Sequence, residues 1–160
     1  MGDQGASLAD DAYSLNYNPA SMPMLDHQEV AFMHNQWAEG ITQQYLAYVY
    51  PKAPLGSLGA SMNLLQVGGF PGYDASGTKA GDVSAQALAV SLAYAHRLWG
   101  PDDPKDGLGL SAGFSFKYLQ ERLETELATG IAGDLGLLCD FPLKDVAMRV
   151  GVAAQHLGQG

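Results

Sequence analysis

Apolar and small polar residues alternate along most of the chain after residue 28, with the period of two that is typical of β-strands. In the clearest case, residues 108–118, apolar side chains occupy the even positions, and glycine, serine and lysine occupy the odd ones. Similar alternation predicts further strands at 29–37, 41–50, 55–65, 83–98, 126–138 and 147–156. Simple antiparallel, up-and-down order is the most economical arrangement of these seven strands.

The segments between the predicted strands contain turn-forming residues. Ala38-Glu39-Gly40 has the length of a hairpin link and ends in glycine. Clusters of Gly, Pro and Asp predict two long loops, at 68–82 and 100–107, and shorter connections are expected at 120–124 and 141–145.

The first 27 residues differ from the rest, because turn and cap formers replace the alternation. Asp10 or Asp11 is expected to cap a short helical turn. A long helix is excluded because Pro19 and Pro23 interrupt it. The sequence therefore predicts a separate N-terminal segment at 1–27, followed by a β-sheet that occupies 28–160.

The second face of the predicted strands distinguishes a membrane sheet from a soluble one. A soluble sheet carries Lys, Glu, Thr and Arg on its outward face, whereas here that face is mostly Gly, Ala and Ser. No charged residue occurs at 83–96 or at 107–116, and many aromatic residues lie near predicted strand ends. One large apolar face and one small polar face are typical of strands that cross hydrocarbon, where closed barrels pair every backbone group. We therefore expect an all-β, antiparallel up-and-down transmembrane β-barrel; a soluble structural β-domain is the alternative.

Composition and charge exclude other classes of function. Charged residues make up 16% of the chain, below the average for a soluble domain, and the net charge of −9 with scattered basic residues argues against nucleic acid. The single cysteine, Cys139, excludes an internal disulfide. No apolar run is long enough for a transmembrane helix, and no signal peptide opens the sequence. With an odd number of strands, these features lead us to expect a fragment: the first half of a longer barrel.

No constellation of residues indicates catalysis, a metal or a cofactor. The four histidines fall on separate elements without ligand spacing, and the glycines at 107–113 lie in a predicted strand with no helix after it, so a phosphate-binding loop is rejected. Asp134 and Arg149 lie on the small-residue face of successive strands, which predicts an ion pair inside the barrel. A polar contact to the N-terminal segment or to a ligand is the functional alternative for these two residues.

The stretch at 5–20, GASLADDAYSLNYNPA, resembles the N-terminal segment of the PorV/PorQ family, which belongs to a wider group similar to long-chain fatty-acid transporter barrels. Both carry an Asn-Pro-Ala motif just before the first strand, here Asn18, Pro19 and Ala20. From the residues alone, this motif predicts a fixed turn that leads the chain into the first strand. Weaker matches extend the resemblance over nearly the whole chain, at 29–37, 45–51, 132–136 and 155–160.

The resemblance implies an outer-membrane barrel of about fourteen strands, in which the N-terminal segment folds as a hatch. Asp10, Asp11, Asn18, Pro19 and Ala20 would form the motif of this hatch segment, residues 1–27. The implied role is recognition or shuttling of cargo of the type IX secretion system, with outer-membrane lipid, secreted proteins and secretion components as partners. Passage of hydrophobic small molecules is the alternative in the same location.

Overall fold

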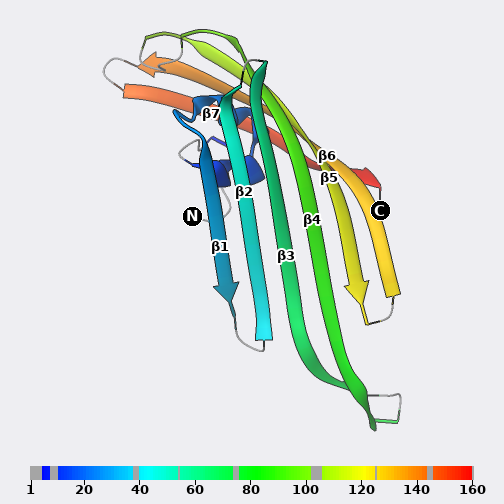
Figure 1. Cartoon of the computed structure of the whole chain (residues 1–160). Helices are drawn as coiled ribbons and strands as arrows, with labels where there is room; N and C mark the ends of the chain where they lie inside the picture. The colour runs from blue at the N-terminus through cyan, green and yellow to red at the C-terminus, as the bar shows by residue number, and fades with distance from the viewer. Residues whose placement is uncertain are drawn as a thin grey trace.

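The structure, a computed structural model, describes residues 5–7, 11–37, 40–53, 55–73, 76–101, 106–124, 126–143 and 146–159. Within these residues, two short 3-10 helices are followed by seven strands (Figure 1). The helices are η1 (Ala12–Asn16) and η2 (Pro19–Met24). The strands are β1 (Glu29–Gln36), β2 (Ile41–Ala53), β3 (Gly56–Tyr73), β4 (Lys79–Trp99), β5 (Gly109–Leu123), β6 (Glu126–Leu143) and β7 (Val146–Gln159).

All seven strands belong to one antiparallel sheet in which each strand pairs with its neighbour in the sequence, in the order β1 to β7. The all-β class and the up-and-down order are thus confirmed. Within the described residues the sheet is open, with β1 and β7 as its edges, and it does not close into a barrel. It is strongly curved, however, since the six-residue η2 contacts strands from β2 to β6 (Figure 1).

The strands are longer than the sequence predicts, and one predicted loop is wrong. Instead of a long loop at 68–82, β3 and β4 continue as a hairpin in which Phe70 pairs with Val83 and Gly72 pairs with Gly81. Register shifts within this hairpin accommodate the extra glycines that suggested a loop. The predicted connections at 120–124 and 141–145 are also largely strand, whereas Ala38 and Glu39 of the first hairpin link lie outside the described residues.

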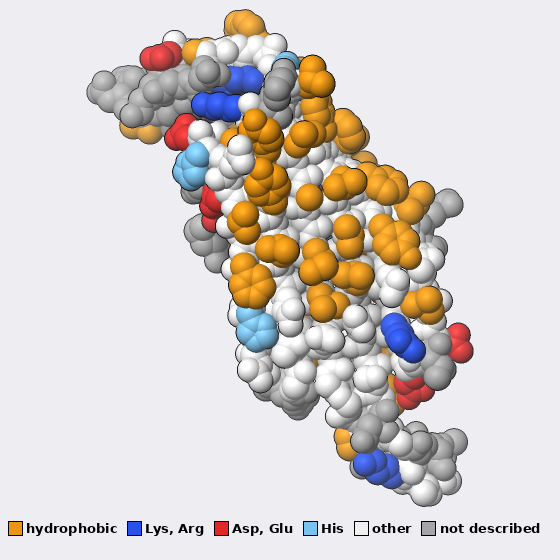
Figure 2. All heavy atoms as spheres, viewed as in Figure 1, with side chains coloured by type: hydrophobic (Ala, Val, Ile, Leu, Met, Phe, Trp, Pro, Cys, Tyr) orange, Lys and Arg blue, Asp and Glu red, His pale blue; other side chains and the backbone are white. Residues whose placement is uncertain are grey.

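The two faces of the sheet differ as the alternation predicts. On the convex face, large apolar side chains are exposed: 63% for Leu92, 52% for Phe116 and 65% for Val152. On the concave face, their neighbours are buried, with exposures of 6% for Ala93 and 5% for Ser115. Figure 2 shows the apolar side chains gathered in a band on the convex face, with charged side chains beyond its ends. We call this band the apolar belt.

Rows of paired residues define one border of the apolar belt. At the end where β1 meets β2, consecutive strands place polar residues side by side on the convex face. The row runs from Gln36 through Thr42, Gln66 and Gln86 to Arg122, each paired with the next. On β4 the apolar residues of the belt lie between Gln86 of this row and the exposed His96.

Candidate functional site

The described part of the hatch segment, residues 5–7 and 11–27, lies on the concave side of the sheet, where each 3-10 helix is capped by an acidic or amide side chain. The Asp11 carboxylate accepts a hydrogen bond from the Tyr13 backbone N–H at 2.8 Å and begins η1. The Asn18 Oδ1 accepts from the Ala20 N–H at 3.0 Å and begins η2, with Pro19 at the first helical position. Asp10 lies outside the described residues.

Asn18 also joins the hatch segment to the sheet. Its Nδ2 donates to the Leu137 carbonyl of β6 at 3.1 Å and to the Ala6 carbonyl at 2.7 Å. Both amide hydrogens and the amide oxygen are therefore used, and the residue is fully buried. The sequence predicts only a local turn here; the bond to β6 spans 119 positions and no local pattern indicates it.

Glycines on the concave face make room for the hatch segment. A Cβ added at Gly113 of β5 would lie 2.6 Å from the Ala20 backbone nitrogen, and one at Gly136 of β6 would overlap the Asn18 side chain. Because the obstacle at Gly113 is backbone, no side-chain rotation relieves it. The small-residue face that the sequence suggests for a barrel interior thus serves, in this region, as the docking surface of the hatch segment.

An apolar core fills the space between the hatch segment and strands β2 and β4. Its buried members are Ala12, Leu15, Met22, Leu25, Tyr45, Ala47, Val49, Ala93 and Ala95. The rings of Tyr13 and Tyr45 pack with centroids 4.6 Å apart. Burial, then the neighbouring Tyr17 and Asp11, raise the pKa of the Tyr13 hydroxyl, which stays protonated and donates to the Met33 sulfur.

Asp134 and Arg149 both belong to the concave face, but they do not pair with each other, and the predicted ion pair is wrong. Arg149 Nε lies 2.7 Å from Asp140 Oδ1, and Arg97 Nη1 lies 3.1 Å from Asp140 Oδ2. The Asp140 side chain is fully buried between these two guanidinium groups. Arg97 also donates to the Met24 sulfur at 3.1 Å, so this cluster contacts the end of η2.

Asp134 forms a second polar cluster on the same face. Its Oδ2 lies 2.6 Å from Lys117 Nζ and accepts from Ser115 Oγ at 2.8 Å. Its Oδ1 accepts from the backbone N–H of His156 at 2.9 Å, next to a register shift between β6 and β7. The carboxylate thus holds the irregular end of β7, where His156 adopts a positive φ of 56°.

Strand register explains both pairings. Asp140 is directly opposite Arg149 in the β6–β7 ladder, and Asp134 is directly opposite Ser115 in the β5–β6 ladder. With the correct turn positions, counting residues along each strand from the turn would have placed Asp140 opposite Arg149 and Ser115 opposite Asp134. The sequence prediction ended the strand at residue 138, before Asp140, and so missed this carboxylate and with it Arg97.

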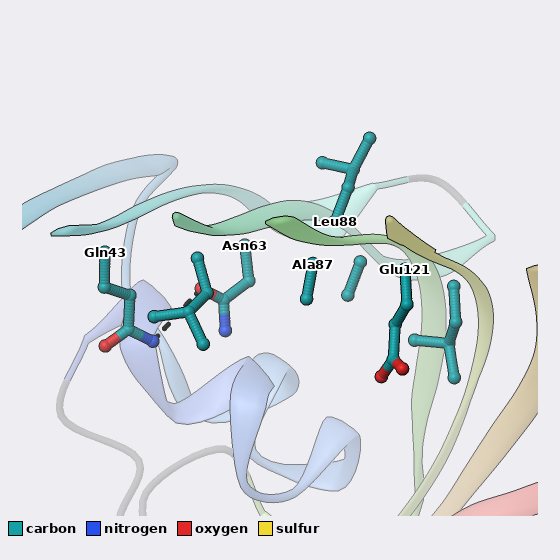
Figure 3. A pocket seen from close by; sticks show the side chains of 8 residues that line it. Gln43, Asn63, Ala87, Leu88 and Glu121 are labelled. Atoms are coloured by element: carbon teal, nitrogen blue, oxygen red, sulfur yellow. Dashed lines mark hydrogen bonds between the residues drawn. The ribbon is translucent and has the colours of Figure 1, made fainter. Parts of the chain in front are cut away.

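A hollow of about 180 Å³ lies on the concave face beyond the hatch segment (Figure 3). Gln43, Asn63 and Glu121 lie on the side of the sheet that faces the hatch segment, whereas Leu88 points away from it (Figure 3). Gln43 Nε2 donates to Asn63 Oδ1 at 3.1 Å. The floor between these polar groups is apolar, formed by Leu65, Ala87, Ala89 and Leu119. Such a lining suits non-covalent contact with an amphipathic molecule.

A comparison with protein-family models matches residues 1–137 to the Uncharacterised protein family (UPF0164). The chain belongs to this family. The UPF0164 match contains the whole hatch segment and the strands that dock it, including Asn18, Gly113 and Gly136. It ends before Asp140 and Arg149, so this ion pair lies outside the matched residues. No curated protein and no solved structure matches the chain.

Two further observations bear on the site of this UPF0164 member. Among the described residues, no three His, Cys, Asp or Glu side chains gather closely enough to hold a metal ion. The helices in the described part of the chain are too short or too polar for any of them to cross a membrane.

Proposed function

We propose that this protein is an outer-membrane β-barrel protein of the PorV/PorQ type, whose seven described strands form part of the barrel wall. The observation that carries the proposal is the apolar belt of the convex face. In water, a contiguous surface of exposed Leu, Val and Phe of this extent would promote association. Hydrocarbon solvates the same surface without cost, which explains why the large side chains point outward and the small ones inward.

The height of the apolar belt supports a membrane setting. On β4, Gln86 and His96 are ten positions apart, which is about 33 Å at about 3.3 Å per residue. A strand tilted by about 40° would then cover about 25 Å along the membrane normal, which matches the apolar band of known membrane barrels. In that setting the edges β1 and β7 must also pair, because unpaired backbone groups are costly in lipid.

Within that barrel we propose that the protein recognises the C-terminal signal domain of cargo of the type IX secretion system and passes it to the attachment machinery. The support is the resemblance of the segment 5–20, together with the docking of this segment through Asn18 to β6. A hatch held inside the wall would close the lumen and leave the exposed loops for cargo.

Cell fractionation tests the membrane part of the proposal. The natural protein should sediment with outer membranes, resist carbonate extraction and migrate faster on gels before heating than after it. Recovery of the protein in the soluble fraction would refute the membrane setting. Deletion of the gene should leave cargo with the signal domain unattached; normal attachment in the deletion strain would refute the secretion role alone.

The concave hollow supports a second function, the passage of hydrophobic small molecules. Its floor of Leu65, Ala87 and Leu119 would contact an alkyl chain, and Gln43 and Glu121 would contact a polar end. Organic extraction of the purified protein, followed by mass spectrometry, should then release a stoichiometric amphipathic molecule. A protein that carries none, yet binds cargo, would favour the secretion role.

A further inference from the structure

A second hollow, of about 300 Å³, includes the polar border of the apolar belt. Its polar lining consists of Gln66, Ser84, Gln86, Arg122 and Glu124. Gln66 pairs with Gln86 across β3 and β4, and Gln86 pairs with Arg122 across β4 and β5. Three long polar side chains therefore lie side by side on the convex face, just beyond the apolar belt.

The hollow contains one positive and one negative group that are not paired with each other. Arg122 Nε donates to the Glu124 backbone carbonyl at 3.3 Å. Among the described residues, the remaining guanidinium nitrogens and the Glu124 carboxylate have no hydrogen-bond or ion-pair partner. The Glu124 backbone N–H donates to the Ser84 carbonyl at 3.0 Å, which fixes the turn against β4. The two charges are thus held on one rim of the hollow.

We propose that this hollow binds the zwitterionic phosphoethanolamine headgroup of a membrane lipid. Arg122 would bind the phosphate, Glu124 the ammonium, and the amides of Gln66 and Gln86 the remaining phosphate oxygens. The acyl chains would run along the belt over Leu64 and Leu88, a directly opposed pair two positions from the Gln66–Gln86 pair of this polar row. The inference rests on the proposed membrane setting and specifies a lipid for it.

The local charges favour a zwitterion over an anionic lipid. Glu124 and Glu126, at the same turn as Arg122, give this end of the hairpin more negative than positive charge. A headgroup with phosphate alone would be repelled by these carboxylates, whereas an ammonium group compensates for one of them.

Native mass spectrometry of the whole protein, extracted from its own membrane and presented with mixed phosphatidylethanolamine and phosphatidylglycerol, tests the proposal. We expect retention of phosphatidylethanolamine in preference to phosphatidylglycerol. Arg122→Gln and Glu124→Gln should each reduce that retention by about fivefold, the size of one partly exposed charged contact. Lys52→Gln, which removes an exposed charge near the opposite end of the sheet, serves as the control and should leave retention unchanged.

The outcomes separate this inference from the proposed function. Equal retention of both lipids, or retention that neither Arg122→Gln nor Glu124→Gln reduces, would overturn the headgroup site while the protein still resides in the membrane. Preference for phosphatidylglycerol that increases in Glu124→Gln would overturn the zwitterion in favour of a simple phosphate site. A protein that is absent from the membrane fraction would instead refute the proposed function itself. Gel migration before and after heating verifies that each variant is folded.

Discussion

Asn18 offers the sharpest test of how the hatch segment is held, because one buried side chain makes three hydrogen bonds with three different backbone groups. In Asn18→Ala the cap of η2 is lost, which costs about 1 kcal/mol. The carbonyls of Ala6 and Leu137 also lose their side-chain donor, at about 1 kcal/mol or more for each partly buried group left unpaired. We therefore expect Asn18→Ala to lower the free energy that holds the hatch segment on the sheet by about 3 kcal/mol in total.

Asn18→Asp tests the direction of these bonds. The aspartate retains the acceptor for the Ala20 N–H, but it replaces the donating Nδ2 with an oxygen that faces the carbonyls of Ala6 and Leu137. A buried carboxylate without a cation adds the cost of desolvation. Although aspartate is as good a helix cap as asparagine, Asn18→Asp should therefore be more destabilising than Asn18→Ala.

Hydrogen exchange of the segment 11–25 in the whole protein measures the effect. A loss of about 3 kcal/mol corresponds to about a hundredfold faster exchange if the segment opens locally. Asp11→Ala, which removes an exposed cap at the start of η1, is the control and should cost only about 0.5–1 kcal/mol. If Asn18→Asp protects the segment as well as the natural residue does, the side chain is not a donor to the sheet, which contradicts docking through the Leu137 carbonyl.

Three other predictions concern the sheet. Gly113→Val should lower the free energy of unfolding in detergent by about 1–3 kcal/mol, because the valine side chain would meet the backbone of the hatch segment. Ala112→Val, on the opposite face of β5, should be nearly neutral, and equal losses in the two variants would contradict this docking. Asp140→Asn should lower the free energy of unfolding by about 3–5 kcal/mol in the same assay, since it leaves two guanidinium groups without their shared carboxylate. An unchanged unfolding midpoint would show that the cluster is solvated. Leu92→Arg should reduce stability in lipid vesicles by about 2–4 kcal/mol while Leu92→Ala has a much smaller effect; a neutral arginine would place Leu92 in water.

The sequence predicted most of the fold because the alternation is a local property. A side chain two positions along a strand returns to the same face whatever the rest of the chain does. The segment 108–118 therefore predicted its own two faces correctly, and Leu110, Phe114 and Phe116 all lie on the convex side. The prediction was wrong where it rested on amino-acid composition and not on periodicity, as in the glycine-rich segment 68–82, which is largely a hairpin.

The side-chain contacts between strands cannot be predicted from the sequence alone, because they depend on the register of the strands and on the curvature of the sheet. An error of a few residues at a turn changes every partner along the ladder, which is why Arg149 was assigned to Asp134 and not to Asp140. Asp11 and Asn18 were identified as part of a motif, but their partners were not. The hydrogen bond from Asn18 to Leu137 exists only because the sheet curves around the hatch segment.

By itself, the sequence determined the strands, their faces and the apolar character of one surface, since each follows from residues within a few positions of one another. Only the tertiary structure decided that glycines such as Gly113 admit the hatch segment, that Asp140 joins two arginines, and that Arg122 and Glu124 share a hollow. These arrangements arise when distant strands are brought into register around a common interior. The free energy that selects them comes from contacts among residues that are far apart in the chain.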